Sequence, residues 1–268
     1  MLRDKVQALT GDRRLVSAVH DSDAPGGATV PREDLAVGGG ILRRAFLQTP
    51  LRCAGRDATL IRLGERDAPV ILLRDGFAYR SFALSDGRRA ILDVLVPGDI
   101  IGLDHIVLAN PTAEITAANR VGYHTLEPAQ LRALMSDRCV ALSVLALTAE
   151  ARWRGDRLAA MIGRLDAQAR IAALILSIHD RLRRRGLTNH LSFSLPLTQE
   201  QIADHLGLTL VHVNRTLRRL RVERLVLVDR QVVIIMNLDG LRELVRGLPQ
   251  PAEMPEQLGA LDRPPLGD

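Results

Sequence analysis

The residues whose types and spacing most clearly indicate a function lie in one segment, residues 197–220, with the sequence LTQEQIADHLGLTLVHVNRTLRRL. Thr198 and Gln201 have the spacing of a capping box, which predicts a helix from Thr198 to about Leu206. Gly207 can adopt the left-handed conformation that ends a helix, and Thr209 can cap a second helix with apolar residues at intervals of four and three. The spacing therefore predicts two short helices joined by a tight turn.

The outer face of the second helix combines side chains that can read DNA bases. These side chains form one strip opposite the apolar positions, and they are Leu210, Val211, Asn214, Arg215 and Arg218. In a helix-turn-helix, the start of the second helix enters the major groove. There arginine bonds guanine, asparagine bonds adenine and apolar groups touch thymine methyls. Arg215 is the leading candidate for reading a base.

Four side chains near the two helix starts are expected to hold phosphates. They are Thr198, Gln199, Thr209 and His212. Hydroxyl, amide, imidazole and backbone N–H groups at helix starts bind phosphate oxygens. We expect these contacts to position the protein on DNA without specifying its sequence.

The surrounding residues also favour a DNA-binding domain. Residues 225–238, LVLVDRQVVIIMNL, predict a two-stranded wing, and a short final helix is expected over about 237–246. Residues 164–247 carry 14 arginines and 8 acidic residues, a net charge of +6, whereas the whole chain has +5, so the remainder has about −1. Positive charge gathers where phosphate contacts require it. The simpler alternative is a helical hairpin with a solvated arginine face.

Two longer helices are expected to position this domain. The first covers about 138–162, with apolar residues at heptad spacing that favour pairing with a second chain over packing on the chain's own β-domain. The expected seam is Val140, Val144, Leu147, Ala151, Arg154, Leu158, Met161 and Leu165. The second helix covers about 166–185, and its last turns contain Arg181, Arg183, Arg184 and Arg185. These arginines complement the helix dipole, which is a sufficient reason for their presence.

From about Leu42 to Leu126 the sequence pattern changes to short apolar runs separated by turn residues. Asp75-Gly76 and Asp86-Gly87 stand between such runs, and each pair predicts a β-hairpin because both residues tolerate positive φ. This part of the chain is expected to be an antiparallel β-domain.

Composition limits the remaining function classes. The 268 residues suit two domains, and Cys53 and Cys139 are too few to hold a zinc ion or an iron–sulfur cluster within one chain. No metal, cofactor or catalytic residue is therefore expected. Residues 1–40 are expected to be a mobile arm with at most one short helix, and 248–268 a disordered Pro-rich tail. Because no signal peptide or long apolar stretch is evident, we expect a cytoplasmic protein without membrane contact.

The residues 197–220, with the helix before them and the wing after them, closely resemble the Crp/Fnr family of bacterial transcription regulators. The resemblance covers about 42–247. Residues 70–103, VILLRDGFAYRSFALSDGRRAILDVLVPGDIIGL, look like the central hairpins of a cyclic-nucleotide-binding-type β-roll. The resemblance implies an α+β fold with an N-terminal antiparallel β-roll of the double-stranded jelly-roll type, a long central dimerisation helix and a C-terminal winged helix-turn-helix.

The resemblance also implies an organisation and a set of partners. We expect a mobile arm over 1–40, a β-roll sensor domain over 41–127, linker and dimerisation helices over 128–163, a winged helix-turn-helix over 164–247 and the tail after it. A homodimer is expected to bind double-stranded DNA at a palindromic operator and to contact RNA polymerase. Thr209 and His212 fall where the family contacts phosphate, and Leu210, Val211 and Arg215 where it reads bases. Val211 replaces a glutamate found in many members, so the familiar half-sites are not assumed.

The effector region departs further from the family pattern. Ala113-Glu114 stands near the position of the phosphate-binding Arg-Ser or Arg-Thr pair, and an acidic residue there would repel a cyclic phosphate. Cyclic AMP is therefore not the expected effector, which stays unknown. His105 is expected to be a hydrogen-bonded structural residue and not a haem ligand.

Two other function classes remain open at this point. The chain could be a small-molecule sensor whose DNA-binding domain is vestigial, in which case salt-dependent affinity for DNA would be missing. An enzyme is the weakest candidate, since the sequence has no metal-ligand cluster, phosphate loop or nucleophile elbow. The expectation is a sequence-specific transcriptional regulator.

Overall fold

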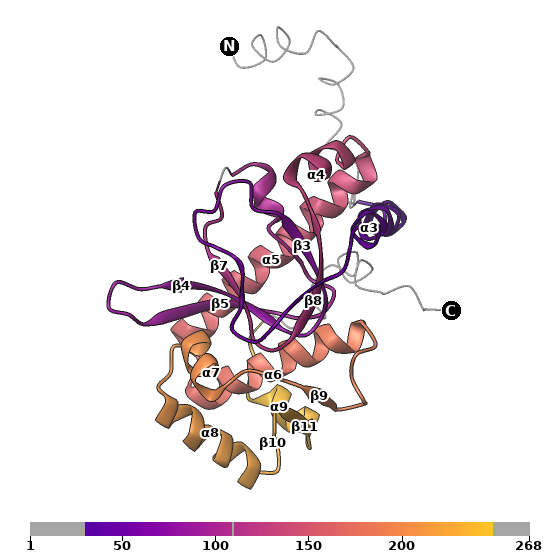
Figure 1. Cartoon of the computed structure of the whole chain (residues 1–268). Helices are drawn as coiled ribbons and strands as arrows, with labels where there is room; N and C mark the ends of the chain where they lie inside the picture. The colour runs from indigo at the N-terminus through magenta and orange to yellow at the C-terminus, as the bar shows by residue number, and fades with distance from the viewer. Residues whose placement is uncertain (1–29, 109, 249–268) are drawn as a thin grey trace, which may run out of the picture. The chain divides into compact units, whose positions relative to one another are not determined.

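The computed structural model describes residues 30–108 and 110–248. Two four-stranded antiparallel sheets form its N-terminal part (Figure 1). The first has the order β1 (Arg52–Ala54), β8 (Val121–Leu126), β3 (Val70–Asp75) and β6 (Ile100–Ile101). The second has the order β2 (Thr59–Ile61), β7 (Glu114–Ala117), β4 (Ala78–Ala83) and β5 (Arg89–Leu95). A 3₁₀ turn, η1 (Leu103–Ile106), follows β6.

Helices and a small third sheet form the rest of the described chain. The helices are α3 (Arg32–Leu47), α4 (Pro128–Leu134), α5 (Arg138–Arg164), α6 (Ala167–Arg184), α7 (Gln199–Leu206), α8 (Leu210–Val222) and α9 (Leu238–Glu243). The third sheet has the order β10 (Val226–Asp229), β11 (Val232–Ile235) and β9 (Ser192–Ser194). The α+β fold predicted from the sequence, with a β-roll, a long central helix and a winged helix-turn-helix, is confirmed.

The two Asp-Gly pairs of the β-roll have different structures. Asp86-Gly87 connects β4 to β5 in a true hairpin. The hairpin predicted at Asp75-Gly76 is wrong, because β3 pairs with β6 and β8 whereas β4 belongs to the other sheet. A Cβ on Gly76 would lie 2.2 Å from the carbonyl oxygen of Arg120, and the residue has φ +75°. Glycine is therefore required here by a close crossing between sheets.

The N-terminal boundary also differs from the prediction. Residues 32–40, expected to belong to a mobile arm, form the first half of α3, while residues 1–29 lie outside the described part of the chain. A Cβ on Gly38 would lie 2.0 Å from the carbonyl oxygen of Cys139, so this glycine lets α3 approach α5 closely. The hydroxyl of Ser143 donates to the carbonyl of Leu35 across the same contact. Gly38, one of the glycines that suggested flexibility, thus permits helix packing.

The seam predicted on α5 is wrong for most of its residues, because they pack within the chain, whereas Ala151 is exposed. Val140, Val144 and Met161 are nearly fully buried in cores formed with the chain's other elements. Arg154, the polar interruption of the seam, forms an ion pair with Asp93 of β5 at 3.0 Å. The alternative reading, a helix lying on its own β-domain, accounts for this stripe.

One buried apolar cluster connects the second sheet of the β-roll with the C-terminal domain. It includes Tyr79 of β4 and Val94 of β5 together with Ile178 of α6, Leu206 of α7 and Val213 of α8. All five are at most 2% exposed. The helix-turn-helix therefore rests on a continuous core and not on an isolated small one. Among the described residues, no helix is both long and apolar enough to cross a membrane.

Candidate nucleic-acid interface

The helix-turn-helix is built by the caps that the sequence predicted. Thr198 accepts a hydrogen bond from the backbone N–H of Gln201 at 3.1 Å, and the Gln201 side chain accepts one from the N–H of Thr198 at 2.9 Å. Gly207 ends α7 in the left-handed conformation with φ +62°. Thr209 then caps α8, and its hydroxyl accepts from the N–H of His212 at 3.2 Å. These caps fix the angle at which α8 leaves α7.

The structure places all nine predicted site residues on exposed positions of α7, α8 or their caps. The strip of α8 is apolar at its start, where Leu210 is 48% and Val211 73% exposed. A partner that covers these two adjacent apolar groups would remove them from water, which is favourable. Arg215 and Arg218 continue the strip, and neither has a hydrogen bond or ion pair with another described residue.

The inner face of α8 holds the helix in place. Val213 and Leu220 are fully buried, and Leu217 is half-buried. Thr216 is 7% exposed, although its hydroxyl hid it from a prediction based on apolar spacing. Its position, three residues after Val213 and four before Leu220, is the signal that could have found it.

Two other α8 side chains are engaged within the domain. The Asn214 amide donates to the carbonyl of Leu210 at 3.1 Å, so this predicted base reader is held against its own helix. Arg219 pairs with Glu223 at 2.8 Å, and the Gln168 amide of α6 donates to the same carboxylate. Arg215, Arg218 and Arg221 are exposed guanidinium groups of this helix, and the first two lie on the predicted strip.

The predicted wing is a two-stranded hairpin with a tight turn. Arg230 and Gln231 both have positive φ, +44° and +68°, between β10 and β11. This is the pattern of a type I′ turn, whose twist matches that of the flanking strands. The exposed side chain of Arg230 is thus presented at the tip of the wing. Sequence reasoning located the wing but did not include this arginine among the site residues.

The arginines at the end of α6 have a structural role that the helix dipole does not explain. Arg181 and Arg185 are buried and both pair with Asp99, in the turn between β5 and β6. Burial alone would raise the pKa of Asp99, but the two guanidinium groups outweigh burial and hold that pKa well below its usual value. The expectation that this cluster only complements the dipole is wrong for Arg181 and Arg185.

Helix α7 also contacts the β-roll directly. Arg89 of β5 pairs with Asp204 at 2.9 Å. The ring of His205 donates from Nδ1 to the carbonyl of Ile91 at 3.1 Å, and burial lowers the pKa of this histidine. The neutral form of His205 is therefore the form that fits between α7 and β5.

Arg170 connects the end of the long helix to the helix-turn-helix. Its guanidinium donates to the carbonyls of Ile162 and Leu165 at the end of α5 and to that of Leu206 at the end of α7, at 2.7 to 3.0 Å. Terminal carbonyls of helices lack partners within the helix, so one side chain satisfies three of them. Sequence reasoning missed this residue, since an arginine at the start of α6 has no distinctive spacing.

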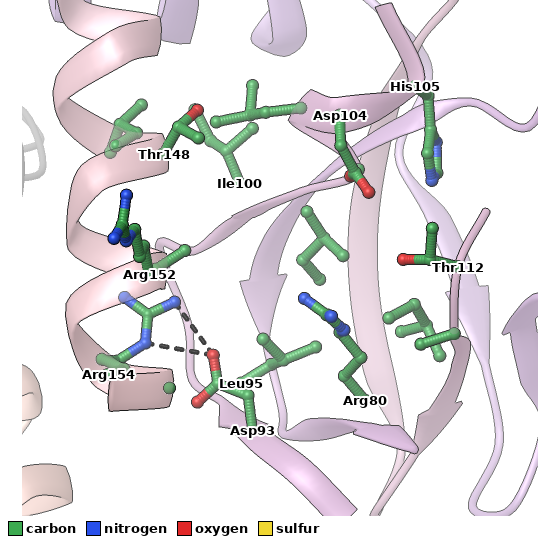
Figure 2. Close-up of a pocket in the computed structure, with 18 residues that line it drawn as sticks. Arg80, Asp93, Leu95, Ile100, Asp104, His105, Thr112, Thr148, Arg152 and Arg154 are labelled. Atoms are coloured by element: carbon green, nitrogen blue, oxygen red, sulfur yellow. Dashed lines mark hydrogen bonds and ion pairs between the residues drawn. The ribbon is translucent and has the colours of Figure 1, made fainter. Parts of the chain in front are cut away.

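A cavity of about 340 Å³ lies between the β-roll and α5 (Figure 2). Arg80 of β4 points into it, and its buried Nε has no hydrogen-bond partner among the described residues. Asp104 and Thr112 also line it. Glu114 does not line it, and its carboxylate accepts from the Thr116 hydroxyl at 3.2 Å. The repulsion of a cyclic phosphate by Glu114 stays a prediction from the sequence.

His105 lies at the edge of this cavity in the role that the sequence predicted. Its Nδ1 is 3.1 Å from the carbonyl of Ala68, so the ring is hydrogen-bonded to backbone. The ring also packs against Gly102, where a Cβ would lie 2.6 Å from it. This histidine holds the loop after β6.

Comparisons with known proteins agree with this architecture. A family model described as a Crp-like helix-turn-helix domain matches residues 169–244. The chain is 35% identical over 166 residues to the nitrogen fixation regulation protein FixK of Rhizobium meliloti. This alignment covers 60% of this chain and 71% of that protein. It is 30% identical over 180 residues to the transcriptional activatory protein AadR of Rhodopseudomonas palustris, which covers 65% of this chain and 69% of that one.

A solved structure shows the same arrangement. FixK2 from Bradyrhizobium japonicum matches with a TM-score of 0.66 and 25% sequence identity, over 73% of this chain and 96% of that one. With the exposed strip of α8, the wing and the β-roll described above, these relatives identify the chain as a transcriptional regulator with a DNA-binding helix-turn-helix, a member of the Crp/Fnr family.

Proposed function

We propose that the protein binds DNA as a homodimer and reads a two-fold symmetric operator with α8. The exposed strip from Leu210 to Arg218 carries this proposal, because it combines apolar side chains with two arginines free of other described residues. Arg215 would bond a guanine in the major groove, and Leu210 and Val211 would contact thymine methyls. Asn214 would read a base after leaving the carbonyl of Leu210.

The phosphate contacts are assigned to groups around this strip. Thr198, Gln199, Thr209 and His212 are exposed at or near the starts of α7 and α8, where unpaired backbone N–H groups favour anions. Arg230 at the wing tip adds a charge that would reach a neighbouring phosphate. These groups would set the register on DNA and contribute salt-dependent affinity.

The dimer contact is assigned to the outward face of α5, opposite the stripe that the chain buries. Its exposed residues recur at heptad spacing and comprise Leu145, Ala149, Arg152, Asp156, Ala159 and Gly163. Leu145 is 65% exposed and Ile162, beside this stripe, is 39% exposed, which suits a surface that a second chain covers. Family members bind DNA as dimers.

Signal sensing and transcription complete the proposal. The cavity between the β-roll and α5 would hold the effector, with the Arg80 guanidinium as its polar anchor (Figure 2). A ligand there would act by favouring one of two orientations of the DNA-binding domains. Family members contact RNA polymerase, and the same contact is proposed for this chain.

Selection of bound duplexes from a random pool tests the proposal. The wild-type chain, Arg215→Ala and the control Arg242→Ala on α9 are compared at one salt concentration, with and without cell extract as an effector source. We expect wild type and control to enrich the same two-fold symmetric site, and Arg215→Ala to lose one base preference in each half-site. Failure of the wild type to enrich any site would favour the small-molecule sensor with a vestigial DNA-binding domain.

A further inference from the structure

A second cleft lies away from both the α8 strip and the β-roll cavity, where α3, β3, β8 and the end of α6 meet. Its volume is about 420 Å³, within the range of small-molecule sites. Its charged and titratable lining residues are Arg43, Arg74, Arg185 and His124, without any carboxylate. Such a lining favours an anion.

The rest of the lining is apolar and partly open to solvent. Leu47 of α3 and Leu187 after α6 are 44% and 48% exposed, and both line the cleft, as does the buried Leu72. A ligand with an apolar body would remove the two exposed leucines from water, which is favourable in proportion to the area covered. The cleft thus combines cationic groups with an apolar wall.

His124 adds a specific polar requirement. Its Nδ1 is 2.9 Å from the carbonyl oxygen of Thr49, and because a carbonyl only accepts, Nδ1 is the donor. In the neutral ring Nε2 is then an acceptor, and it is buried without a hydrogen-bond partner in the described chain. Buried polar atoms usually have a partner, so an O–H or N–H donor on a ligand would complete this histidine.

Arg185 and Arg74 differ in whether other residues of the protein already bind their guanidinium groups. Arg185 lies against Gly98 and donates to Asp99 at 2.8 Å, so it is held by the turn between β5 and β6. Arg74, at the exposed end of β3, has no hydrogen bond or ion pair with another described residue. It is the group best placed to bind an incoming carboxylate in the two-pronged geometry that guanidinium favours.

We propose that this cleft binds an organic carboxylate that has an apolar body and one O–H or N–H donor. Arg74 binds the carboxylate, the leucines cover the body, and Nε2 of His124 accepts from the donor. The bound ligand lies beside Arg185 and so next to the contact that holds α6 on the β-roll. This site is separate from DNA reading and does not depend on the proposed function.

Titration calorimetry of the full chain tests the site. The probes are 4-hydroxyphenylacetate and 3-hydroxyoctanoate, with neutral 4-hydroxyphenylacetamide for comparison. We expect at least one carboxylate to bind with one-to-one stoichiometry and the amide to bind about tenfold more weakly, as loss of a charge-assisted hydrogen bond requires. Arg74→Gln should weaken binding about tenfold. Arg44→Gln, an exposed α3 arginine outside the lining, and Arg80→Gln, in the β-roll cavity, should not change it.

Carboxylate side chains of this protein itself are a second source of a group that could occupy the cleft. Asp4, Asp12, Asp21, Asp23, Glu253, Glu256, Asp262 and Asp268 lie outside the described residues, and a full-length variant with all eight changed to amides separates these side chains from a free ligand. Equal probe binding by both chains indicates a free ligand, and binding only by the variant indicates that the chain's own carboxylates take the site. Leu187→Glu should abolish binding in either case. The proposal is overturned if neither chain binds a probe, or if Arg74→Gln binds as tightly as the wild type.

Discussion

Two arginines at the end of α6 and two on α8 belong to one domain but lie in opposite surroundings. Arg181 and Arg185 on α6 are buried at 4–5% exposure and pair with Asp99 of the β-roll. Arg215 and Arg218 on α8 are exposed and without such partners among the described residues. Arginine abundance alone therefore does not locate a DNA-binding surface, since part of the charge is neutralised inside the protein.

The C-terminal domain thus has one side that attaches it to the β-roll and another side that is available to a partner. The α6 side holds the domain on the β-roll through ion pairs and a shared core, together with the His205 and Asp204 contacts of α7. The α8 side leaves its polar and apolar groups available to a partner. Substitutions on the two sides should therefore affect stability and DNA reading separately.

The largest expected effect comes from breaking the buried ion pairs. Arg181→Met should lower the free energy of unfolding by about 3–5 kcal/mol, because Asp99 would keep a buried charge with one partner fewer. Arg183→Met, on the same helix but with a 62% exposed side chain, should change it by less than about 0.5 kcal/mol. Urea unfolding followed by Trp153 fluorescence measures both, and equal losses would remove the distinction.

Acid should reproduce part of this loss in the wild type. The pKa of Asp99 in the fold lies below its value in the unfolded chain, about 3.9. Its contribution is therefore fully present above that value and is lost as pH falls below about 4. The stability difference between wild type and Asp99→Asn should stay constant from about pH 7 to 5 and shrink below about 4. A difference that does not change with pH would contradict the assigned ion pairs.

A smaller effect is expected on the α8 side, and in a different quantity. Arg215→Ala should reduce the preference for the selected operator over a scrambled duplex by about 1–3 kcal/mol per half-site. The free energy of unfolding should change by less than about 0.5 kcal/mol, because the side chain is exposed. Fluorescence anisotropy at fixed salt gives the affinities. An unchanged preference would remove Arg215 from base reading.

The smallest effect is expected at the wing. Arg230→Gln should weaken binding to operator and scrambled duplex by the same factor and reduce the slope of log affinity against log salt by about 1.8, because the homodimer loses two phosphate contacts worth about 0.9 each. Anisotropy titrations at several salt concentrations give the slope. A change limited to the operator would instead place Arg230 at a base.

The helix-turn-helix could be predicted almost completely from the sequence, because local chemistry determines it. Thr198 with Gln201, Gly207 and Thr209 specify the helix ends without help from distant residues. The exposed strip follows from the helical period. The buried Thr216 was not predicted, because its hydroxyl excludes it from a search for apolar residues at helical spacing.

The long-range features could not be predicted in the same way. The stripe on α5 has the heptad spacing of a dimer seam, but such spacing does not distinguish a second chain from the chain's own sheets. Arg154 was the informative residue, since its partner Asp93 lies on β5 and is 61 positions away in sequence. Similarly, nothing near Arg181 or Arg185 in the sequence indicates that Asp99 neutralises them.

Methylation footprinting of the selected operator with dimethyl sulfate, which modifies guanine N7 in the major groove, tests the central claim most directly. If α8 reads DNA in a dimer, guanines in two successive major grooves, about 34 Å apart, should be protected. Arg215→Ala should expose the guanine in each half-site that Arg215 contacts, while Arg183→Met should leave the footprint intact. Binding without protection of any guanine N7, or protection that persists in Arg215→Ala, would contradict base reading by Arg215.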